Sequence, residues 1–368
     1  MIDFPASPTV GQTFTSGAQS WTWDGAKWVA SGVYVGPPQF SNTNRIINGD
    51  MMIDQRNLGA SGTTAGYTLD RWAFVNSTAP TGRGAWRQAA ASAGSALLSA
   101  GFGYYLNFIS SGAYTPAAAD NFGFFQAIEA DMVTDLLWGT ANAQPITLSF
   151  LAYSSLTGQF GGVIANAKTG TRVYPFSFNL PAANTWTTIS ITIPGDTAAG
   201  WTLSGNGIGM AVRFDLGSGA NFRAPAGAWT TGDIRGATGD VNVVATNGAV
   251  FNLTGVKLEL GSVATPFPRQ TLAKTMLDCQ RYYQFGQAFL ATYASAAGQA
   301  VSYGFMAPVP LRVLGPWAVT VSGSSNVNWT LAGFNYNAAG NFNISGTAVA
   351  AGAVTITVQF NTGTAAEL

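Results

Sequence analysis

The sequence predicts an all-β, multi-domain chain of β-sandwich or jelly-roll modules, with a Trp-rich N-terminal hairpin, a short connecting helix and a C-terminal β-sandwich domain. Apolar residues alternate with Thr and Ser in many short segments, for example at Ile189, Ile191 and Ile193. This period of two is typical of strands with one buried face. Gly-rich turns separate the segments, and the hydrophobic fraction of 47% is sufficient for a buried core.

Residues 1–30 contain the predicted hairpin, centred on Asp24-Gly25. A type I′ turn at this dipeptide would place Trp21 opposite Trp28, with Trp23 on the same face of the hairpin. Two strands cannot cover three indoles. We therefore interpret the hairpin as a docking element that buries this face against another protein; packing against the chain's own domain is the alternative.

Residues 31–43 are rich in Gly, Pro and Ser, which predicts a linker. From 44 to 270 the alternating segments predict one β-sandwich or jelly-roll domain. In the segment 251–260 the apolar residues change from odd to even positions at Gly255. A one-residue slip would turn the following side chains to the wrong face, so we expect a β-bulge at Thr254-Gly255.

Two segments depart from the β pattern. Residues 120–137 carry apolar residues at helical spacing with acids between them, which predicts a short helix with solvated acidic side chains. Residues 271–284 carry a clearer apolar stripe, which predicts a helix that connects the domain before it to a C-terminal β domain, residues 285–368. The stripe consists of Leu272, Met276, Cys279 and Tyr283. It fits either an intrachain core or a trimer axis.

The residues that are missing exclude several functions. The chain has no histidine, which removes His-based nucleophilic triads and His-based metal sites. Its single cysteine, Cys279, excludes an intrachain disulfide and is most simply a small buried residue. A formal net charge of zero without basic runs gives no surface for nucleic acid. We therefore expect no metal, cofactor or nucleic acid.

The surface and the N-terminus add two expectations. Charged residues make up 9% of the chain, against roughly 25% in an ordinary domain, so hydroxyl and amide groups must dominate the surface. The start of the sequence lacks the basic and apolar regions of a signal peptide, and no apolar stretch is long enough to span a bilayer. We expect synthesis in the cytoplasm without a signal peptide and no membrane insertion.

Three groups of motifs carry a resemblance to a known family. They are Asn44-Arg45-Ile46-Ile47-Asn48-Gly49-Asp50-Met51 with Ile53-Asp54-Gln55-Arg56-Asn57 and Tyr67-Thr68-Leu69-Asp70-Arg71-Trp72; Gly255-Val256-Lys257-Leu258-Glu259-Leu260-Gly261 with Ala264-Thr265-Pro266-Phe267 and Cys279-Gln280-Arg281-Tyr282-Tyr283; and the head from Pro5-Ala6-Ser7-Pro8 to Trp28. In this order and spacing they resemble bacteriophage tail fibre and tail-tip proteins with a carbohydrate-binding-module-like jelly roll.

The resemblance implies a virion tail protein. Such a protein would be a homotrimer, would attach to other tail or baseplate proteins through its N-terminus, and would bind a host surface polysaccharide through its distal domains. Release by lysis would account for the absent signal peptide. A surface poor in charge and rich in hydroxyl and amide groups also suits contact with a polysaccharide. A purely structural tail component without host contact, and a polysaccharide depolymerase, remain as alternatives.

Candidate sites follow from these hypotheses. Aromatic residues in a Gly/Asn/Ser-rich stretch of the C-terminal domain are candidates for stacking on sugar. They are Trp317, Trp329, Phe334 and Tyr336. For Trp329, alternation with Val327 and Leu331 also fits a position in the core.

Charged motif residues allow other interpretations. Asp70-Arg71-Trp72 is expected to be a structural bracket, because buried charges usually occur in pairs. Glu129, Asp131 and Asp135 form the densest acidic group, but sequence spacing cannot show a paired acid and base, so we expect no catalytic residue.

Overall fold

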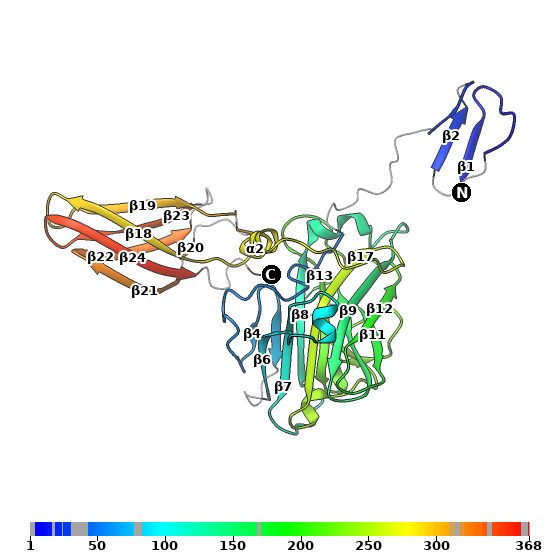
Figure 1. Cartoon of the computed structure of the whole chain (residues 1–368), viewed down its shortest axis with the longest axis horizontal. Helices are drawn as coiled ribbons and strands as arrows, with labels where there is room; N and C mark the ends of the chain where they lie inside the picture. The colour runs from blue at the N-terminus through cyan, green and yellow to red at the C-terminus, as the bar shows by residue number, and fades with distance from the viewer. Residues whose placement is uncertain are drawn as a thin grey trace. The chain divides into compact units, whose positions relative to one another are not determined.

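The computed structural model describes residues 4–16, 19–23, 25–30, 43–76, 83–167, 171–309, 311–312, 317–318, 320–336, 341–361 and 367. The chain divides into two compact units, Met1–Ser41 and Asn42–Leu368. The expected linker at 31–43 lies outside the described residues except for residue 43. Nearly all regular structure is β, which confirms the predicted fold class (Figure 1). Among the helices that the structure describes, none is long and apolar enough to cross a membrane.

The first unit is a three-stranded antiparallel sheet. Its strands are β1 (Thr13–Ser16), β2 (Gln19–Trp23) and β3 (Trp28–Ala30), in the order β1-β2-β3. The predicted register of the hairpin is wrong, because Trp28 pairs with Trp23 rather than with Trp21. Residues 25–27 lie between the two strands, and Asp24 of the predicted turn lies outside the described residues. The pairing brings two indoles to 5.7 Å as a cross-strand aromatic pair.

The second unit begins with a two-sheet jelly roll. One sheet has the order β15-β11-β10-β13-β8-β5-β4, and the other has the order β12-β9-β17-β7-β6. The strands of the first are β4 (Gly66–Tyr67), β5 (Ala73–Asn76), β8 (Asn121–Glu129), β10 (Gly158–Ala165), β11 (Arg172–Leu180), β13 (Ile208–Ser218) and β15 (Thr230–Thr231). Those of the second are β6 (Gly84–Ala90), β7 (Tyr104–Ser110), β9 (Ile146–Ser154), β12 (Thr187–Ile193) and β17 (Val250–Leu260).

The core lies between these sheets and is rich in phenylalanine. Phe150 contacts both Phe178 and Phe214 at a centroid distance of 5.0 Å, in edge-to-face geometry. Each strand that lines the core alternates between this face and an outer face, as the period-two pattern predicts. Strand β8 pairs with β13 in one sheet, and β9 pairs with β17 in the other (Figure 1). The alternation decides which side chains can reach a ligand from outside.

The expected β-bulge in β17 is confirmed. The register to β9 shifts between Thr254 and Lys257, and Gly255 adopts a φ of 62°. A Cβ at Gly255 would lie 2.8 Å from the ring of Phe102. The bulge therefore needs glycine both for its backbone conformation and for the close approach of that ring.

The helix expected at 120–137 is wrong in its first half. Residues 121–129 form strand β8, whose alternate residues Phe122, Phe124 and Ile128 fill the core. A 3-10 helix, η1 (Ala130–Leu136), follows it. Further short elements complete the jelly roll: α1 (Ala96–Ser99), η2 (Ala220–Phe222), β14 (Arg223–Ala224), β16 (Gly236–Ala237) and η3 (Val243–Ala245).

The connecting helix is present as α2 (Leu272–Gln280), capped by the Thr271 side chain, which accepts a hydrogen bond from the Lys274 N–H. Only part of the predicted stripe is buried. Cys279 and Tyr283 lie inside the chain's own core, whereas 56% of Leu272 is exposed. Of the two interpretations of the stripe, the intrachain core therefore describes its C-terminal half.

A second β-sandwich follows. One sheet has the order β18-β24-β21 and the other has the order β19-β23-β22-β20. The strands are β18 (Phe285–Ala294), β19 (Ala300–Met306), β20 (Trp317–Ala318), β21 (Thr320–Val327), β22 (Trp329–Tyr336), β23 (Asn341–Ala348) and β24 (Gly352–Asn361). Its core forms between the two sheets and includes Phe342 and Val354.

Candidate functional site

The C-terminal aromatic residues do not form an exposed site. Trp329, Phe334 and Tyr336 are all buried in the core of the second sandwich, with Tyr336 fully inaccessible. The Tyr336 hydroxyl accepts a hydrogen bond from the Leu311 N–H at 3.1 Å. The core alternative for Trp329 is thus confirmed, and the expected exposure of the other two is wrong. The side chain of Trp317 lies outside the described residues.

The three head tryptophans remain half-buried. Phe4 stacks on Trp28 at 5.4 Å and meets the edge of Trp21 at 5.3 Å. The first unit therefore covers part of the aromatic face with its own phenylalanine. The docking role of Trp21, Trp23 and Trp28 stays a prediction.

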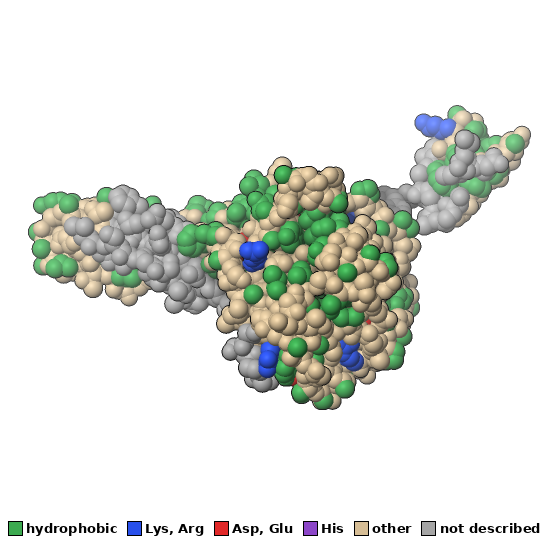
Figure 2. Space-filling view, turned by 60° about the horizontal axis from the view of Figure 1, so that its bottom comes forward, with side chains coloured by type: hydrophobic (Ala, Val, Ile, Leu, Met, Phe, Trp, Pro, Cys, Tyr) green, Lys and Arg blue, Asp and Glu red, His purple; other side chains and the backbone are tan. Residues whose placement is uncertain are grey.

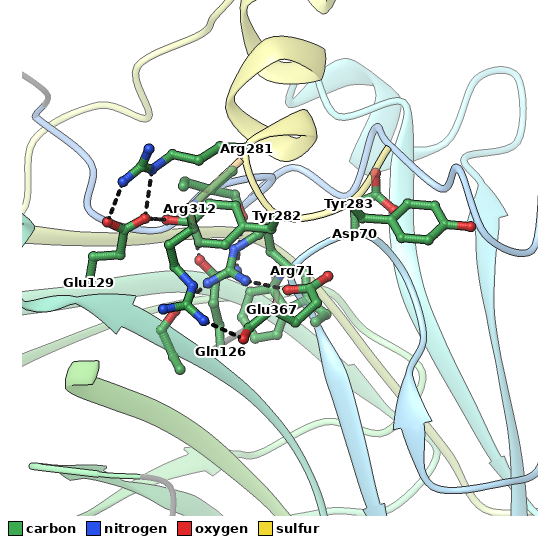
Figure 3. A network of polar contacts seen from close by, with 12 residues as sticks. Asp70, Arg71, Gln126, Glu129, Arg281, Tyr282, Tyr283, Arg312 and Glu367 are labelled. Carbon is green, nitrogen blue, oxygen red and sulfur yellow. Dashed lines mark hydrogen bonds and ion pairs between the residues drawn. The ribbon is translucent and has the colours of Figure 1, made fainter. Parts of the chain in front are cut away.

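The motif residues of the resemblance meet in a buried polar network (Figure 3). Arg71 donates to Glu367 Oε2 and to the Ala127 carbonyl, each at 2.6 Å, and its guanidinium lies 3.5 Å from the centroid of the Tyr282 ring. Arg312 donates to the Glu367 carbonyl at 2.8 Å. These contacts join jelly-roll residues to residues that follow the second sandwich. The bracket interpretation of Asp70-Arg71-Trp72 fits this burial.

Glu129 belongs to the same network. Arg281 donates to both of its carboxylate oxygens at 2.8 Å, and the Tyr282 hydroxyl donates to Oε1 (Figure 3). Burial alone would raise the pKa of Glu129, but these hydrogen bonds outweigh it and lower the pKa. Asp135 is buried and paired with Arg45 at 2.8 Å. The expectation that these acids are solvated is therefore wrong for Glu129 and Asp135, and each has a structural partner.

Two buried carboxyl groups give the protein a pH-dependent stability. Burial raises the pKa of Asp70 and of Asp240 to about 6 in each case. A raised pKa means that the folded state holds the proton more tightly, so stability is greatest below the unfolded pKa and falls as pH rises through 6. We expect the free energy of unfolding to drop by about 2 kcal/mol per group between pH 4.5 and 7. Urea unfolding at the two pH values measures it, and D70N should reduce the difference; an unchanged difference would contradict the assignment.

The outer face of the five-stranded sheet is half covered. At one end Lys257 and Glu259 form a buried ion pair of 2.8 Å beneath the segment 262–269. Lys257 donates to the Pro266 carbonyl, and the Glu259 carboxylate accepts from the Thr265 N–H. The segment 262–269, which includes part of the closing motif of the resemblance, thus covers this end of the sheet.

The other end of this outer face lies outside the segment 262–269, and a polar row crosses it, in which Arg87 is exposed and Asn107 and Asn252 are each 6% exposed. Arg87, Asn107, Asn252 and Tyr153 are successive cross-strand partners on β6, β7, β17 and β9. Their neighbours in each strand point into the core, so all four side chains share the outer face. Asn107 Nδ2 donates to Asn252 Oδ1 at 2.7 Å. Asn252 Nδ2 and Asn107 Oδ1 make no hydrogen bond to any residue that the structure describes.

Two further aromatic side chains, Tyr105 and Trp186, border this row on the side of Tyr153. The Trp186 ring lies 5.5 Å from Tyr105 and 5.5 Å from Tyr153, and all three are half-buried. The Tyr153 hydroxyl donates to Asn184 at 3.1 Å, which fixes the direction of its ring. We call the six residues of the row and the aromatic border the open face: Arg87, Tyr105, Asn107, Tyr153, Trp186 and Asn252.

The open face combines apolar surface with directional hydrogen bonding. Half-buried aromatic rings offer rigid apolar surface, and the asparagine pair supplies a free donor and a free acceptor beside it. Arg87, at the end of the row, is exposed and makes no ion pair with any described residue. Figure 2 shows that few charged side chains reach the jelly-roll surface in view. No group of three or more potential metal ligands occurs among the described residues.

No pattern in the sequence alone indicated the open face. The outward direction of Tyr105 and Asn107 was available from alternation with Leu106 and Phe108. Their place beside Asn252 depends on pairing between strands far apart in the chain.

The chain matches no protein-family model and no curated protein. Several solved structures are similar to it. A putative sugar binding protein from Bacteroides thetaiotaomicron VPI-5482 is 14% identical, with 59% of this chain and 99% of that chain covered and a TM-score of 0.35. TmCBM61, solved with beta-1,4-galactotriose, is 9% identical, with 60% and 99% covered and a TM-score of 0.28.

A phage protein is also similar in structure. The enzymatically active domain of tailspike protein 4 of bacteriophage CBA120 is 11% identical, with a TM-score of 0.32. The match covers 59% of this chain but only 21% of the tailspike chain. These identities and TM-scores are too low to support an argument about function.

Proposed function

We propose that this chain is a glycan-binding protein and that the open face of its jelly roll is the binding site. The observation that carries the proposal is the row from Arg87 to Tyr153 with Trp186 beside it. A sugar ring has apolar C–H faces and a rim of hydroxyl groups. The faces suit the rings of Trp186 and Tyr105, and the rim suits the unpaired amide groups of Asn107 and Asn252.

The wider role that we propose is that of a bacteriophage tail fibre or tail-tip protein. The motif resemblance supports this role, and the polar, charge-poor surface is compatible with it. In this proposal the chain forms a homotrimer in the virion tail, docks on tail or baseplate proteins through Trp21, Trp23 and Trp28, and binds a host surface polysaccharide without cleaving it.

The test is a glycan array probed with the labelled full-length chain, with the solution mass measured by light scattering. Retention of one glycan class, lost in a Tyr105→Ala variant, is the expected result. If the folded chain binds no glycan and no host cells, the proposed binding site is wrong, and a structural role in the tail is the remaining hypothesis. Release of shorter products from a bound polysaccharide would instead indicate a depolymerase.

Arg87 provides a prediction about the charge of the glycan. An exposed ion pair between its guanidinium and a sugar carboxylate is worth less than about 1 kcal/mol, which corresponds to about a fivefold change in affinity at most. We expect Arg87→Gln to weaken binding of a uronate-containing glycan about two- to fivefold and to leave binding of its neutral analogue unchanged. Isothermal titration at two salt concentrations measures this, because salt should remove the difference. Equal loss for both glycans would place Arg87 in a different role.

A further inference from the structure

One edge of the five-stranded sheet differs from the other edges of the jelly roll. β12 lies at this edge and pairs with β9 and with no other strand that the structure describes (Figure 1). The edge strands of the seven-stranded sheet, β4 and β15, are only two residues long. At the opposite edge of the five-stranded sheet, Gly62 pairs with Trp86 and covers part of β6. Within the described part of the jelly roll, β12 is thus the long edge without a covering segment.

β12 lacks the features that keep edge strands of natural proteins apart. Such strands are commonly protected by charged side chains, proline or a β-bulge. The segment 181–195 contains no charged residue, and β12 itself contains no proline. Its register to β9 is regular over all seven residues. Another strand could therefore add to this edge without meeting a charge or an irregular backbone.

Every second residue of β12 directs its backbone toward the free edge. In β9, the Ser155 N–H donates to the start of β17, whereas the Ser154 carbonyl accepts from the segment that precedes β12. Successive residues of a strand bond to opposite sides, so β9 bonds to the odd-numbered residues of β12. The backbone groups of Thr188, Ser190 and Thr192 therefore lie at the free edge, and no described backbone group bonds to them.

The sequence around Ser190 reads the same in both directions. Residues 188–192 are Thr-Ile-Ser-Ile-Thr. In an antiparallel pair of two copies centred on Ser190, Thr188 of each copy would lie opposite Thr192 of the other, and the two Ser190 residues would lie opposite each other. These are the residues whose backbone groups lie at the edge, so the pairing would form about six backbone hydrogen bonds.

The side chains of the strand suit the same pairing. Ile189 and Ile191 pack on the core side, and Ile191 is only half-buried. Each would lie opposite the other isoleucine of the second copy, which would bury both further. The three even-numbered side chains are exposed on the outer face. The Thr192 hydroxyl donates to the Ser262 carbonyl at 3.0 Å on that face and so leaves the edge free.

We propose that β12 pairs antiparallel with β12 of a second copy, centred on Ser190, and joins the two five-stranded sheets into one continuous sheet. Opposed residues of paired strands project their side chains to the same face. The open faces of both copies would therefore lie on one side of the joined sheet, where they could engage two units of one polymer. The pairing itself does not depend on sugar binding. A two-fold contact does not close a trimer, so in the proposed tail protein it would link two trimers.

The pairing is expected to be weak and reversible. One strand pair buries less than the roughly 1,200–2,000 Å² of a stable interface. Light scattering of the full-length chain should show a mass that doubles from its value in dilute solution as the concentration rises from about 1 to about 500 µM. Ser190→Lys should keep the smaller mass throughout, because it places two ammonium groups beside the two-fold axis. Ser204→Lys adds the same charge in an exposed loop and should double like the parent.

Two cysteine variants test the register. Residues opposite each other in a hydrogen-bonded pair have Cα atoms about 5.5 Å apart, which is within the range that a disulfide spans. Ser190→Cys should therefore give a covalent dimer under mild oxidation. Thr188→Cys exposes a thiol on the same strand, but its two copies would lie roughly 14 Å apart and should not cross-link. Cys279 is buried and does not compete.

These measurements contain no glycan, so their outcome is separate from that of the glycan array. A mass that stays constant with concentration would overturn the proposal and leave the edge of β12 to a different protein. An undiminished doubling in Ser190→Lys would also overturn it. The same holds if Ser190→Cys forms no covalent dimer, or if Thr188→Cys forms one equally well.

Discussion

Replacing Trp186 by alanine is expected to weaken glycan binding by about thirtyfold or more, which corresponds to about 2 kcal/mol. Trp186 contacts the rings of Tyr105 and Tyr153 and contributes the largest apolar side chain of the open face. Its removal takes away stacking area and also releases the two tyrosine rings from their common neighbour. Isothermal titration with the glycan identified on the array measures the loss.

A matched pair of tyrosines serves as the control. Tyr104 and Tyr105 are adjacent on β7 but point to opposite sides, and both reach the surface in part. Tyr105→Ala should weaken binding, whereas Tyr104→Ala should not. If the two variants bind alike, or if Trp186→Ala binds as well as the parent while remaining folded, the open face is not the site.

The strands were predictable because a period of two is a local property of the sequence. Ile189 and Ile193 reach the core, and the parity change at Gly255 located the bulge. The open face was not predictable in this way. Arg87 and Asn252 are far apart in the chain and share a row only because β7 lies between their strands. Register between distant strands depends on the whole sheet.

Two local patterns gave wrong predictions: helical spacing within a strand, and a loop-like composition around buried aromatic residues. Phe125 and Ile128 have helical spacing, but they lie in strand β8 on opposite faces, with Ile128 in the core. In the C-terminal domain, Gly and Asn around Tyr336 suggested a loop, yet the residue ends strand β22 and its ring is buried. Local composition does not show which side chains are buried, because burial depends on the sheet that packs against them.

Removing either member of the Arg71–Glu367 pair is expected to cost about 3–5 kcal/mol of unfolding free energy. Both side chains are almost fully buried, and their atoms Nη1 and Oε2 are 2.6 Å apart. Either single change leaves the other charge buried with fewer partners. Arg71→Met also loses the contact of the guanidinium with the Tyr282 ring. Urea unfolding followed by tryptophan fluorescence measures the shift.

The double variant distinguishes independent stabilisation by each residue from the cost of leaving one charge buried without its partner. If the network stabilises mainly by satisfying charges that the fold has already buried, Arg71→Met combined with Glu367→Met should cost much less than the sum of the two single changes. Lys274→Met breaks the exposed Lys274–Asp278 pair and should cost less than about 1 kcal/mol. Additive losses in the double variant would mean that Arg71 and Glu367 stabilise the fold independently, through Ala127 and Arg56 respectively.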